Sequence, residues 1–323
     1  MKTFTLACFT LAVCVGHAPR VFAQAYPAKP VRLIIPFPPG GSTDVIGRAF
    51  GGKFSEAWNQ PVVIENRGGA NTIIAAEGAA KSAPDGYTLF LTTAATMTTN
   101  TLLYRKLPYD AKTSFALISM LTISPYLIAA HPSLPAQSLK DLISLARQKP
   151  AQLAYGTSGN GSSGHLTGAL LEMMAGIKLL HVPYKGAAAA LTDALGGQNP
   201  LVITGAQGLA QLAKSGRIRA LATCGTTRLA TWPDLPTVAE SGYPGFEGVT
   251  WFGLVAPAGT PKPIIDRLQA ETVRVGSLLD VRERLGTLGF EVVTGTTEGF
   301  ATFIARELER VARVINHSGI RLE

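Results

Sequence analysis

Two loops rich in glycine and hydroxyl side chains contain the residue types best suited to hold a small anion. The first is residues 36–44, Pro-Phe-Pro-Pro-Gly-Gly-Ser-Thr-Asp, between the apolar run Val31–Ile35 and a helical pattern over residues 45–54. Backbone N–H groups at such a helix start point toward one place, and the positive end of the helix dipole adds to their attraction for an anion. The loop contains no Lys or Arg, and Asp44 would reject a ligand in the wrong charge state. This pattern predicts recognition rather than catalysis.

A second loop, residues 155–165, repeats this composition: Tyr-Gly-Thr-Ser-Gly-Asn-Gly-Ser-Ser-Gly-His, followed by a helical pattern over residues 166–175. Its segment 159–164 matches the dinucleotide pattern G-x-G-x-x-G. A Rossmann site also needs an acid at the end of the next strand to bind the ribose, but residues 180–185 read Leu-His-Val-Pro-Tyr-Lys. No Lys-Ser or Lys-Thr follows the glycines, as a P-loop requires. We therefore expect no cofactor.

An exported serine hydrolase is a second interpretation of this loop, with Ser158 or Ser162 as nucleophile and His165 as base. The nucleophile elbow G-x-S-x-G is absent, because Asn160 or His165 stands where the second glycine belongs. A histidine at a helix start is better placed to donate a hydrogen bond to a ligand or to a carbonyl. We therefore predict no catalytic residues, with the hydrolase as the alternative.

Histidine and cysteine usage offers no metal site. Beyond the first 25 residues the histidines are His131, His165, His181 and His317, and none form a pair with ligand spacing. Cys224 is the one cysteine there, so no internal disulfide can form. Because Cys224 lies in an apolar segment, we expect a buried, inert thiol.

The N-terminal 25 residues read as a secretory signal peptide. Lys2 provides the positive start, residues 4–16 are mostly apolar, and residues 21–25 offer small-residue cleavage sites. The apolar run is shorter than the roughly 20 residues of a membrane-spanning helix. Removing residues 1–25 deletes Lys2 and Arg20 but no acid, so the net charge falls from +8 to +6 (27 − 21).

The composition limits how many domains the exported chain can form and which kinds of partner it can bind. With 323 residues, 46% hydrophobic and 15% charged, it can form one large or two ordinary domains. Its positive charge favours encounters with anions. The basic residues are scattered and are not interleaved with aromatic residues, so we expect no nucleic-acid partner.

Apolar runs alternate with helical patterns along most of the chain, which predicts α/β layers with largely parallel sheets. A helix over 138–148 begins with Ser138 as cap. Thr260-Pro261 should open a helix by capping, Gly289 should close the next, and a last helix should follow Thr297. No flexible linker is evident, so two domains would require more than one crossing. The expected strands are 31–35, 62–65, 88–92, 126–130, 153–155, 178–182, 201–204 and 219–223.

From residue 26 almost to the end, the chain resembles the extracytoplasmic solute receptors of tripartite tricarboxylate transporters, the Bug family of bacterial periplasmic binding proteins. The resemblance covers essentially the whole exported chain, and together its motifs are highly specific. They lie at residues 26–30, 36–44, 65–67, 83–89, 155–165, 181–186, 235–242 and 251–261.

The resemblance implies a two-lobed periplasmic-binding-protein (Venus flytrap) fold, in which each lobe is a mostly parallel sheet flanked by helices. Lobe I would comprise residues 26–124 plus 248–323, and lobe II residues 125–247. It also implies a periplasmic, non-enzymatic receptor that closes on a small carboxylate and delivers it to membrane permease subunits. A binding protein that feeds a sensor kinase is an alternative that sequence cannot separate from transport.

Family members hold the ligand carboxylate through loop amides and ordered waters, which agrees with loops that lack cations. Carried over by position, the contacts in lobe I would be Phe37, Gly40, Gly41, Ser42, Asp44, Thr93, Ala94 and Thr96. Those in lobe II would be Thr157, Ser158, Ser162, His165, Tyr184 and Thr204.

Two departures from the family pattern bear on the ligand. Where members often have Gly-Gly-Asn-Ile, this chain has Asn71-Thr72-Ile73-Ile74, which is bulkier and less polar. Where they often have Gly-Gly-Gln-Val-Asp-Leu-Met-Phe-Asp, residues 196–204 lose both aspartates, and the second is replaced by Thr204. That aspartate could have faced a ligand ammonium. We therefore hypothesise a carboxylate without an amine, with aromatic and dicarboxylic acids as candidates.

Overall fold

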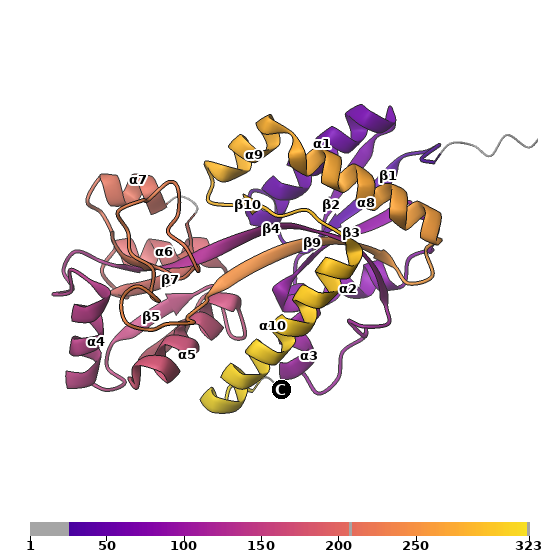
Figure 1. Cartoon of the computed structure of the whole chain (residues 1–323). Helices are drawn as coiled ribbons and strands as arrows, with labels where there is room; N and C mark the ends of the chain where they lie inside the picture. Colours follow the sequence, from indigo (N-terminus) through magenta and orange to yellow (C-terminus); the bar gives the residue numbers. More distant parts are fainter. Residues whose placement is uncertain (1–25, 207–208, 322–323) are drawn as a thin grey trace, which may run out of the picture.

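The computed structural model of the chain describes residues 26–206 and 209–321 (Figure 1). The predicted signal peptide, residues 1–25, lies outside the described residues. Within the described ranges, no helix is both long enough and apolar enough to cross a membrane. The protein has an α/β fold with two lobes of the periplasmic-binding-protein type, as predicted.

The strands of both lobes join in one continuous sheet, in the order β2-β1-β3-β9-β4-β7-β5-β6, with β8 and β10 pairing beside β4. Parallel pairs form each end: β1 with β2 and β3, and β5 with β6 and β7. The central pairs are antiparallel. The strands are β1 (Val31–Ile35), β2 (Val62–Asn66), β3 (Thr88–Thr93), β4 (Phe115–Ala130), β5 (Ala154–Thr157), β6 (Leu180–Pro183), β7 (Leu201–Gly205), β8 (Arg219–Thr223), β9 (Val249–Pro257) and β10 (Glu291–Val292).

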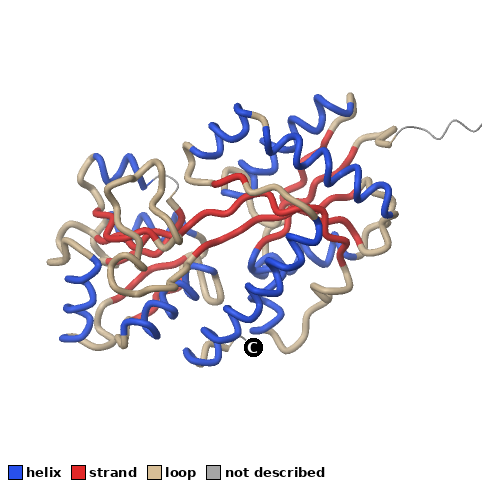
Figure 2. The backbone as a smooth tube through the Cα atoms, in the orientation of Figure 1, coloured by secondary structure: helices blue, strands red, loops and turns tan. Residues whose placement is uncertain are grey.

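Two long strands, β4 and β9, run from one lobe to the other (Figure 2). Residues 115–125 of β4 pair with β9, and residues 126–130 pair with β7 and β8. The sequence predicted only residues 126–130 of β4 and missed β9. Pro125 interrupts the strand pattern in β4, and proline lacks the N–H that a central strand normally donates. The predicted lobe boundary at residues 124/125 lies one residue before the point where β4 changes partners, and the division into lobes stays a proposal.

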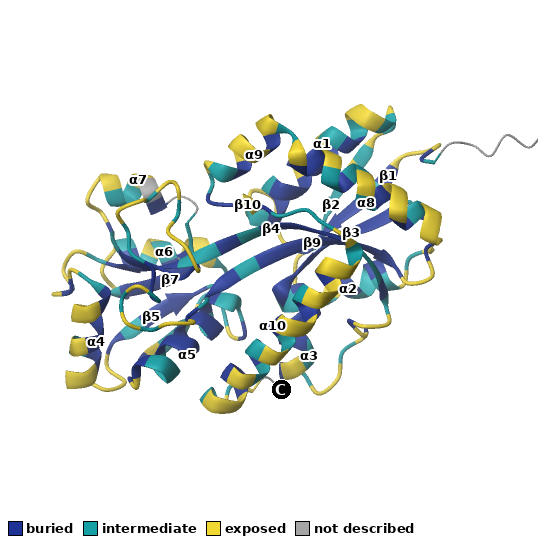
Figure 3. Cartoon of the chain, in the orientation of Figure 1, coloured by how far each residue is buried: buried dark blue, intermediate teal, exposed yellow. Residues whose placement is uncertain are grey.

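Helices cover both faces of the sheet, with buried strands between them (Figure 3). In lobe I, one apolar cluster contains α1, α8 and α9, and another contains α2 and the start of α10. In lobe II, α4 and α5 share a cluster on one face and α6 lies on the other. The α-helices are α1 (Ser42–Trp58), α2 (Ile73–Ala80), α3 (Asn100–Leu103), α4 (Leu139–Gln148), α5 (Ser163–Ala175), α6 (Ala187–Leu195), α7 (Leu209–Lys214), α8 (Lys262–Ser277), α9 (Leu279–Gly286) and α10 (Thr297–Ser318).

The last helix, α10, ties the two lobes together. Phe300 packs in a cluster with strands of lobe I, whereas Val311 lies in the apolar core that α4 and α5 share. Between them, Arg310 donates to the carbonyl of Glu247 at 2.7 Å and to the carboxylate of Glu307 through two bonds of 2.8 Å. The predicted last helix is therefore present, and its apolar face packs on the cores of both lobes.

Local capping predictions have mixed outcomes. Ser138 caps α4, and its hydroxyl accepts from the N–H of Asp141 as predicted. Thr260 does not cap α8: its hydroxyl donates to the carbonyl of Pro257 at 2.8 Å, and Pro261 occupies the N-cap position. α9 ends at Gly286, before Gly289, which lies in the following turn with φ +79°. Cys224 is buried as predicted, and burial raises the pKa of its thiol.

Candidate functional site

The predicted site residues lie on or beside loops at the carboxyl ends of parallel strands. In lobe I these loops follow β1 and β3, and in lobe II they follow β5, β6 and β7. Carboxyl ends of parallel strands meet at one edge of a sheet, where α/β proteins bind their ligands. The two lobes also touch there: a Cβ added at Gly289 would lie 2.8 Å from Cβ of Ala206, which follows β7.

The loop before α1, residues 36–41 (loop 1), is held by Asp44. This carboxylate is buried, accepts from the N–H of Gly40 (3.0 Å) and from Nε of Arg48 (2.9 Å), and its other oxygen accepts from Nδ2 of Asn66 (3.1 Å). Asn66 also donates to the carbonyl of Phe37 at 2.9 Å. The hydrogen bond from Arg48 is the largest cause that holds the pKa of Asp44 below its usual value. The carboxylate therefore organises the loop, and the Gly40 N–H is already engaged.

Arg48 and Asn66 were missed by the sequence analysis. The spacing of Asp44 and Arg48, four residues apart on one helix, is a local signal that could have found the first. Asn66 reaches loop 1 from the end of β2, beside β1 in the sheet, so no local signal pointed to it. Phe37 remains exposed at the loop surface.

The loop before α5, residues 158–162 (loop 2), is held by different groups. The hydroxyl of Ser162 caps α5 by accepting from the N–H of His165 at 3.2 Å. Nδ1 of His165 accepts from the N–H of Gly161 at 3.2 Å. A neutral imidazole that accepts at Nδ1 carries its proton on Nε2, so His165 is a hydrogen-bond donor at that atom. Gly164 allows close packing, because an added Cβ would lie 2.9 Å from the carbonyl oxygen of Ile203.

His181, on β6, is a further residue of this region that the sequence analysis did not place in the site. Its ring stacks on the ring of His165, with centroids 3.7 Å apart and planes 7° apart. Its Nε2 lies 2.7 Å from the hydroxyl of Thr157, which is fully buried. Burial, and then the neighbouring His181, lowers the pKa of His165 to about 3, and burial lowers the pKa of His181 to about 4. Both rings are therefore neutral near pH 7.

The arrangement does not form a serine-protease-like triad. Ser162 accepts from the main chain of His165, and among the described residues no hydrogen bond joins the hydroxyl of Ser158 or Ser162 to the His165 ring. In the same ranges no carboxylate hydrogen-bonds to that ring, which packs instead on a second imidazole. A catalytic base needs both a nucleophile within reach and an orienting partner.

The loops after β2 and β3 meet through buried hydroxyls. Oγ1 of Thr96 lies 2.8 Å from Oγ1 of Thr72 and 3.3 Å from Oγ1 of Thr93, and its carbonyl accepts from the hydroxyl of Tyr109 at 2.9 Å. Thr72 and Thr96 have no exposed surface. Thr96 therefore supports the loop from behind, and Ala94, also buried, begins the same turn.

Residues 71–72, where the chain departs from the family's Gly-Gly-Asn-Ile pattern, have a strained backbone. Ala70, Asn71 and Thr72 have φ values of 44°, 47° and 77°, in the left-handed region that glycine tolerates best. The amides of Asn71 and Asn100 hold this backbone: Nδ2 of Asn71 donates to Oδ1 of Asn100, and Nδ2 of Asn100 donates to the carbonyl of Asn71, both at 2.8 Å. These hydrogen bonds offset part of the backbone strain that arises because Asn71 and Thr72, which are not glycines, adopt left-handed φ values.

The remaining predicted residues of lobe II lie toward the opposite face of the sheet. Tyr184 packs against the apolar cluster beside α6, and its hydroxyl donates to Asp193 at 2.7 Å. Thr204 is nearly buried on β7, opposite Leu127. Since the His165 and His181 rings lie near Tyr155 in the α5 cluster, Tyr184 and Thr204 are separated from them by the sheet.

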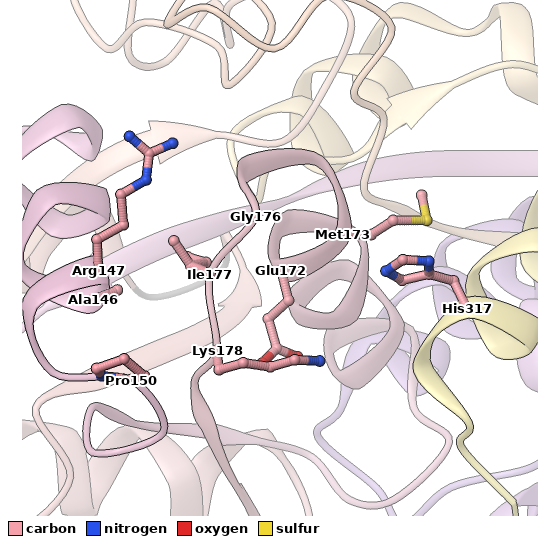
Figure 4. Close-up of a pocket in the computed structure, with 9 residues that line it drawn as sticks. All are labelled: Ala146, Arg147, Pro150, Glu172, Met173, Gly176, Ile177, Lys178 and His317. Atoms are coloured by element: carbon pink, nitrogen blue, oxygen red, sulfur yellow. The ribbon is translucent and has the colours of Figure 1, made fainter.

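A pocket of about 350 Å³ lies at the ends of α4, α5 and α10 and contains none of the predicted site residues (Figure 4). Glu172 accepts there from the N–H of Leu179 at 2.7 Å, and burial raises the pKa of Glu172. Arg147 donates to the carbonyl of Ala175, and Figure 4 shows it pointing away from Lys178. The charge of Lys178, whose side chain lies beside Glu172, partly offsets that rise in pKa, but Arg147 does not join them. Within the described residues, no group of three His, Cys, Asp or Glu could hold a metal ion.

Comparison with known proteins gives consistent matches over nearly the whole chain. The family model described as tripartite tricarboxylate transporter family receptor matches residues 46–320. Protein BugT of Bordetella pertussis is 35% identical over 309 residues, which cover 95% of each chain. A protein encoded in the tcbD-tcbE intergenic region of a Pseudomonas species is 33% identical over 96% of this chain and 92% of its own.

Solved structures show the same fold. Rpa4515 of R. palustris with adipate has a TM-score of 0.86 at 36% identity and covers 92% of this chain and 99% of its own. The periplasmic binding protein BugD has a TM-score of 0.82 at 33% identity, with 92% and 100% covered. MatC of Rhodopseudomonas palustris with bound malate has a TM-score of 0.80 at 30% identity, with 90% and 100% covered.

Proposed function

We propose, from the premise that this chain belongs to the tripartite tricarboxylate transporter receptor family, that it captures a small carboxylate between its lobes and delivers it to a membrane permease. The supporting observation is that a glycine- and hydroxyl-rich loop precedes a helix at the carboxyl edge of the parallel strands in each lobe. We also propose a periplasmic location, because similar solved structures are described as periplasmic.

The proposed binding mode needs no cation in the loops. N–H groups at the starts of α1 and α5, the hydroxyls of Ser42 and Ser158, and Nε2–H of His165 would share the carboxylate with ordered waters. Lobe I would comprise residues 26–124 plus 248–323 and lobe II residues 125–247, with closure by bending at β4 and β9. A carboxylate held by neutral donors can leave more easily than one paired with Arg or Lys, which suits a carrier.

We propose a ligand without an amine, with dicarboxylic acids as first candidates and aromatic acids second. The carboxylate of Asp44 already accepts from three groups, and Thr204 replaces an acid, so neither offers a free negative charge to an ammonium. Two similar receptors were solved with adipate and malate, both dicarboxylates that lack an amine. The exposed ring of Phe37 could pack on an aromatic acid.

Isothermal titration with adipate, malate, benzoate, glutamate and aspartate tests this class. We expect at least one non-amino acid to bind more tightly than both amino acids. Glutamate or aspartate binding more tightly than every non-amino carboxylate would contradict the proposal. Mass spectrometry of small molecules that co-purify with the protein would extend the panel.

Two serine substitutions test the site itself. Ser42→Ala and Ser158→Ala should each weaken binding by about 1–3 kcal/mol, the usual range for a lost hydrogen bond to a charged, buried ligand. Ser277→Ala is the control, because this exposed serine lies at the end of α8, where its hydroxyl donates to the carbonyl of Arg274. If neither substitution changes the affinity, the loops that contain Ser42 and Ser158 do not bind the ligand.

Absence of enzyme activity is part of the proposal. A panel of ester substrates and a serine-reactive probe should give neither turnover nor labelling, and either result would instead favour the hydrolase. Gene neighbourhood would separate delivery to a permease from delivery to a sensor kinase.

A further inference from the structure

We propose that His181 is a positioning residue of the ligand site, which acts by fixing Thr157 and the imidazole of His165. This inference rests on the proposed function. His181 lies on β6 and contacts the two residues that flank loop 2: its ring face stacks on His165, and its Nε2 lies within hydrogen-bond distance of the Thr157 hydroxyl.

The contacts form a closed path around loop 2. The N–H of Gly161 donates to Nδ1 of His165. The His165 ring stacks on the ring of His181. Nε2 of His181 in turn lies 2.7 Å from the hydroxyl of Thr157. That hydroxyl also contacts the N–H and the carbonyl of Gly159, both at 3.3 Å. His181 is therefore the link between the two ends of the glycine turn. Removing it breaks the path at two contacts together.

These contacts determine which ring nitrogen of His165 carries the proton and can donate a hydrogen bond. While Nδ1 accepts from Gly161, the proton of the neutral ring lies on Nε2. If the ring rotates or changes tautomer, the N–H of Gly161 loses its acceptor and Nε2 no longer donates. The parallel stack on His181 at 3.7 Å restricts that rotation. His181 would thus keep His165 as a neutral donor without contacting the ligand.

The groups around this pair add no opposing charge. Tyr155 lies 5.1 Å from the His181 ring, and burial raises the pKa of its hydroxyl, so it stays neutral. Among the described residues, no ion pair involves either histidine. A carboxylate partner would favour the imidazolium, which cannot accept from Gly161 at Nδ1. The stacked imidazole is instead compatible with a neutral ring.

The test compares His181→Ala, which removes the stack and the bond, with His181→Phe, which keeps a ring but not the bond. His131→Ala is the matched control, because His131 is also in lobe II but pairs with Ser133 away from loop 2. Two quantities are measured: the ring ¹⁵N chemical shifts of His165 in the ligand-free protein, and the affinity for adipate by titration.

We expect wild-type His165 to show a protonated Nε2 and an unprotonated Nδ1. His181→Ala should mix the two tautomers and weaken adipate binding about tenfold, which corresponds to about 1.4 kcal/mol. His181→Phe should keep the His165 tautomer and lose less affinity, while His131→Ala changes neither quantity.

Unchanged His165 shifts in His181→Ala would overturn the inference, whatever the affinity. If His181→Ala does not fold, the His165 tautomers are measured in His181→Phe. If they mix in that variant as freely as in a denatured chain, stacking on the ring at position 181 does not position His165, and the inference is overturned. If wild type binds no carboxylate in the panel, the proposed function fails, but the ligand-free shifts still decide whether His181 positions His165.

Discussion

Loop 1 and loop 2 have similar sequences but depend on different chemistry. Loop 1 is organised by an ionised carboxylate, Asp44, which gathers N–H donors from the backbone, from Arg48 and from Asn66. Loop 2 is organised by two neutral imidazoles and a serine cap. α1 starts after Gly41 without a side-chain cap, whereas Ser162 caps α5. A glycine- and hydroxyl-rich turn before a helix therefore predicts the turn, but not the group that stabilises it.

The contrast should be largest in the response to acid. The pKa of both His165 and His181 is lowered in the folded protein, so their stabilisation is complete above the unfolded value of 6.5 and is lost as the pH falls toward 4. The pKa of Asp44 is lowered from 3.8, so loop 1 keeps its contribution over that range and loses it only at lower pH. Taken in full, the two lowered pKa values would reduce the unfolding free energy by about 5 kcal/mol between pH 7 and 4.5. Because both rings are only partly buried and solvent screens them, we expect a loss of about 3 kcal/mol.

Urea unfolding at both pH values measures this loss, and hydrogen exchange should show loop 2 opening before loop 1. The double variant His165→Gln, His181→Gln is the control, and its stability should depend less on pH in this range. Equal pH dependence in wild type and variant would contradict the assignment.

Asp44→Ala should be the most damaging single substitution in loop 1. It leaves the N–H of Gly40 without its acceptor and the amide of Asn66 with the carbonyl of Phe37 alone, so we expect a loss of about 2–3 kcal/mol in unfolding free energy. Asp141→Ala is the control, because the Asp141 carboxylate also accepts three hydrogen bonds, from Gln137 and Ser138, but is exposed in the first turn of α4. Urea denaturation should show the Asp44 variant to be the weaker of the two. The reverse order would mean that Asp44 does not organise loop 1.

Gly164→Ala should affect loop 2 more than Gly41→Ala affects loop 1. A Cβ at Gly164 would press on the carbonyl of Ile203 at 2.9 Å, and relieving such crowding costs about 2 kcal/mol. At Gly41 the nearest atom is 3.7 Å away and φ is −82°, so the added Cβ fits. The change should cost at most about 1 kcal/mol, the disadvantage of alanine relative to glycine at an N-cap. Thermal unfolding of the two variants measures the difference. Similar melting temperatures would show that α5 can move away from β7 at little cost.

Ser162→Ala should have a smaller effect than Gly164→Ala, about 1 kcal/mol, because it removes the side-chain cap of α5. Ser162→Gly should cost only a few tenths of a kcal/mol, since glycine is also tolerated at an N-cap. Chemical denaturation can resolve this difference. Equal losses in both variants would indicate that the hydroxyl contributes little, and that α5 starts as α1 does, without a side-chain cap.

Much of the fold could be predicted from local patterns. The strands 31–35 and 219–223 were predicted with their observed bounds, because each is a short apolar run between turn residues. The bridging strands were not, since most of β4 is defined by its pairing with β9 and not by its own alternation. The wrong cap at Thr260 has a similar cause: its hydroxyl can donate to the carbonyl of Pro257 as readily as it can cap a helix.

The sequence by itself determined that two turns rich in glycine and hydroxyls precede helices, and which residues the family resemblance assigns to the ligand. These are properties of neighbouring residues, governed by backbone freedom and capping. Only the tertiary structure decided that Asn66 supports Asp44, that His181 supports His165, and that Thr96, which was predicted to contact the ligand, is fully buried. Those partners come from adjacent strands or loops, and strand register, which depends on the packing of the whole sheet, brings them together.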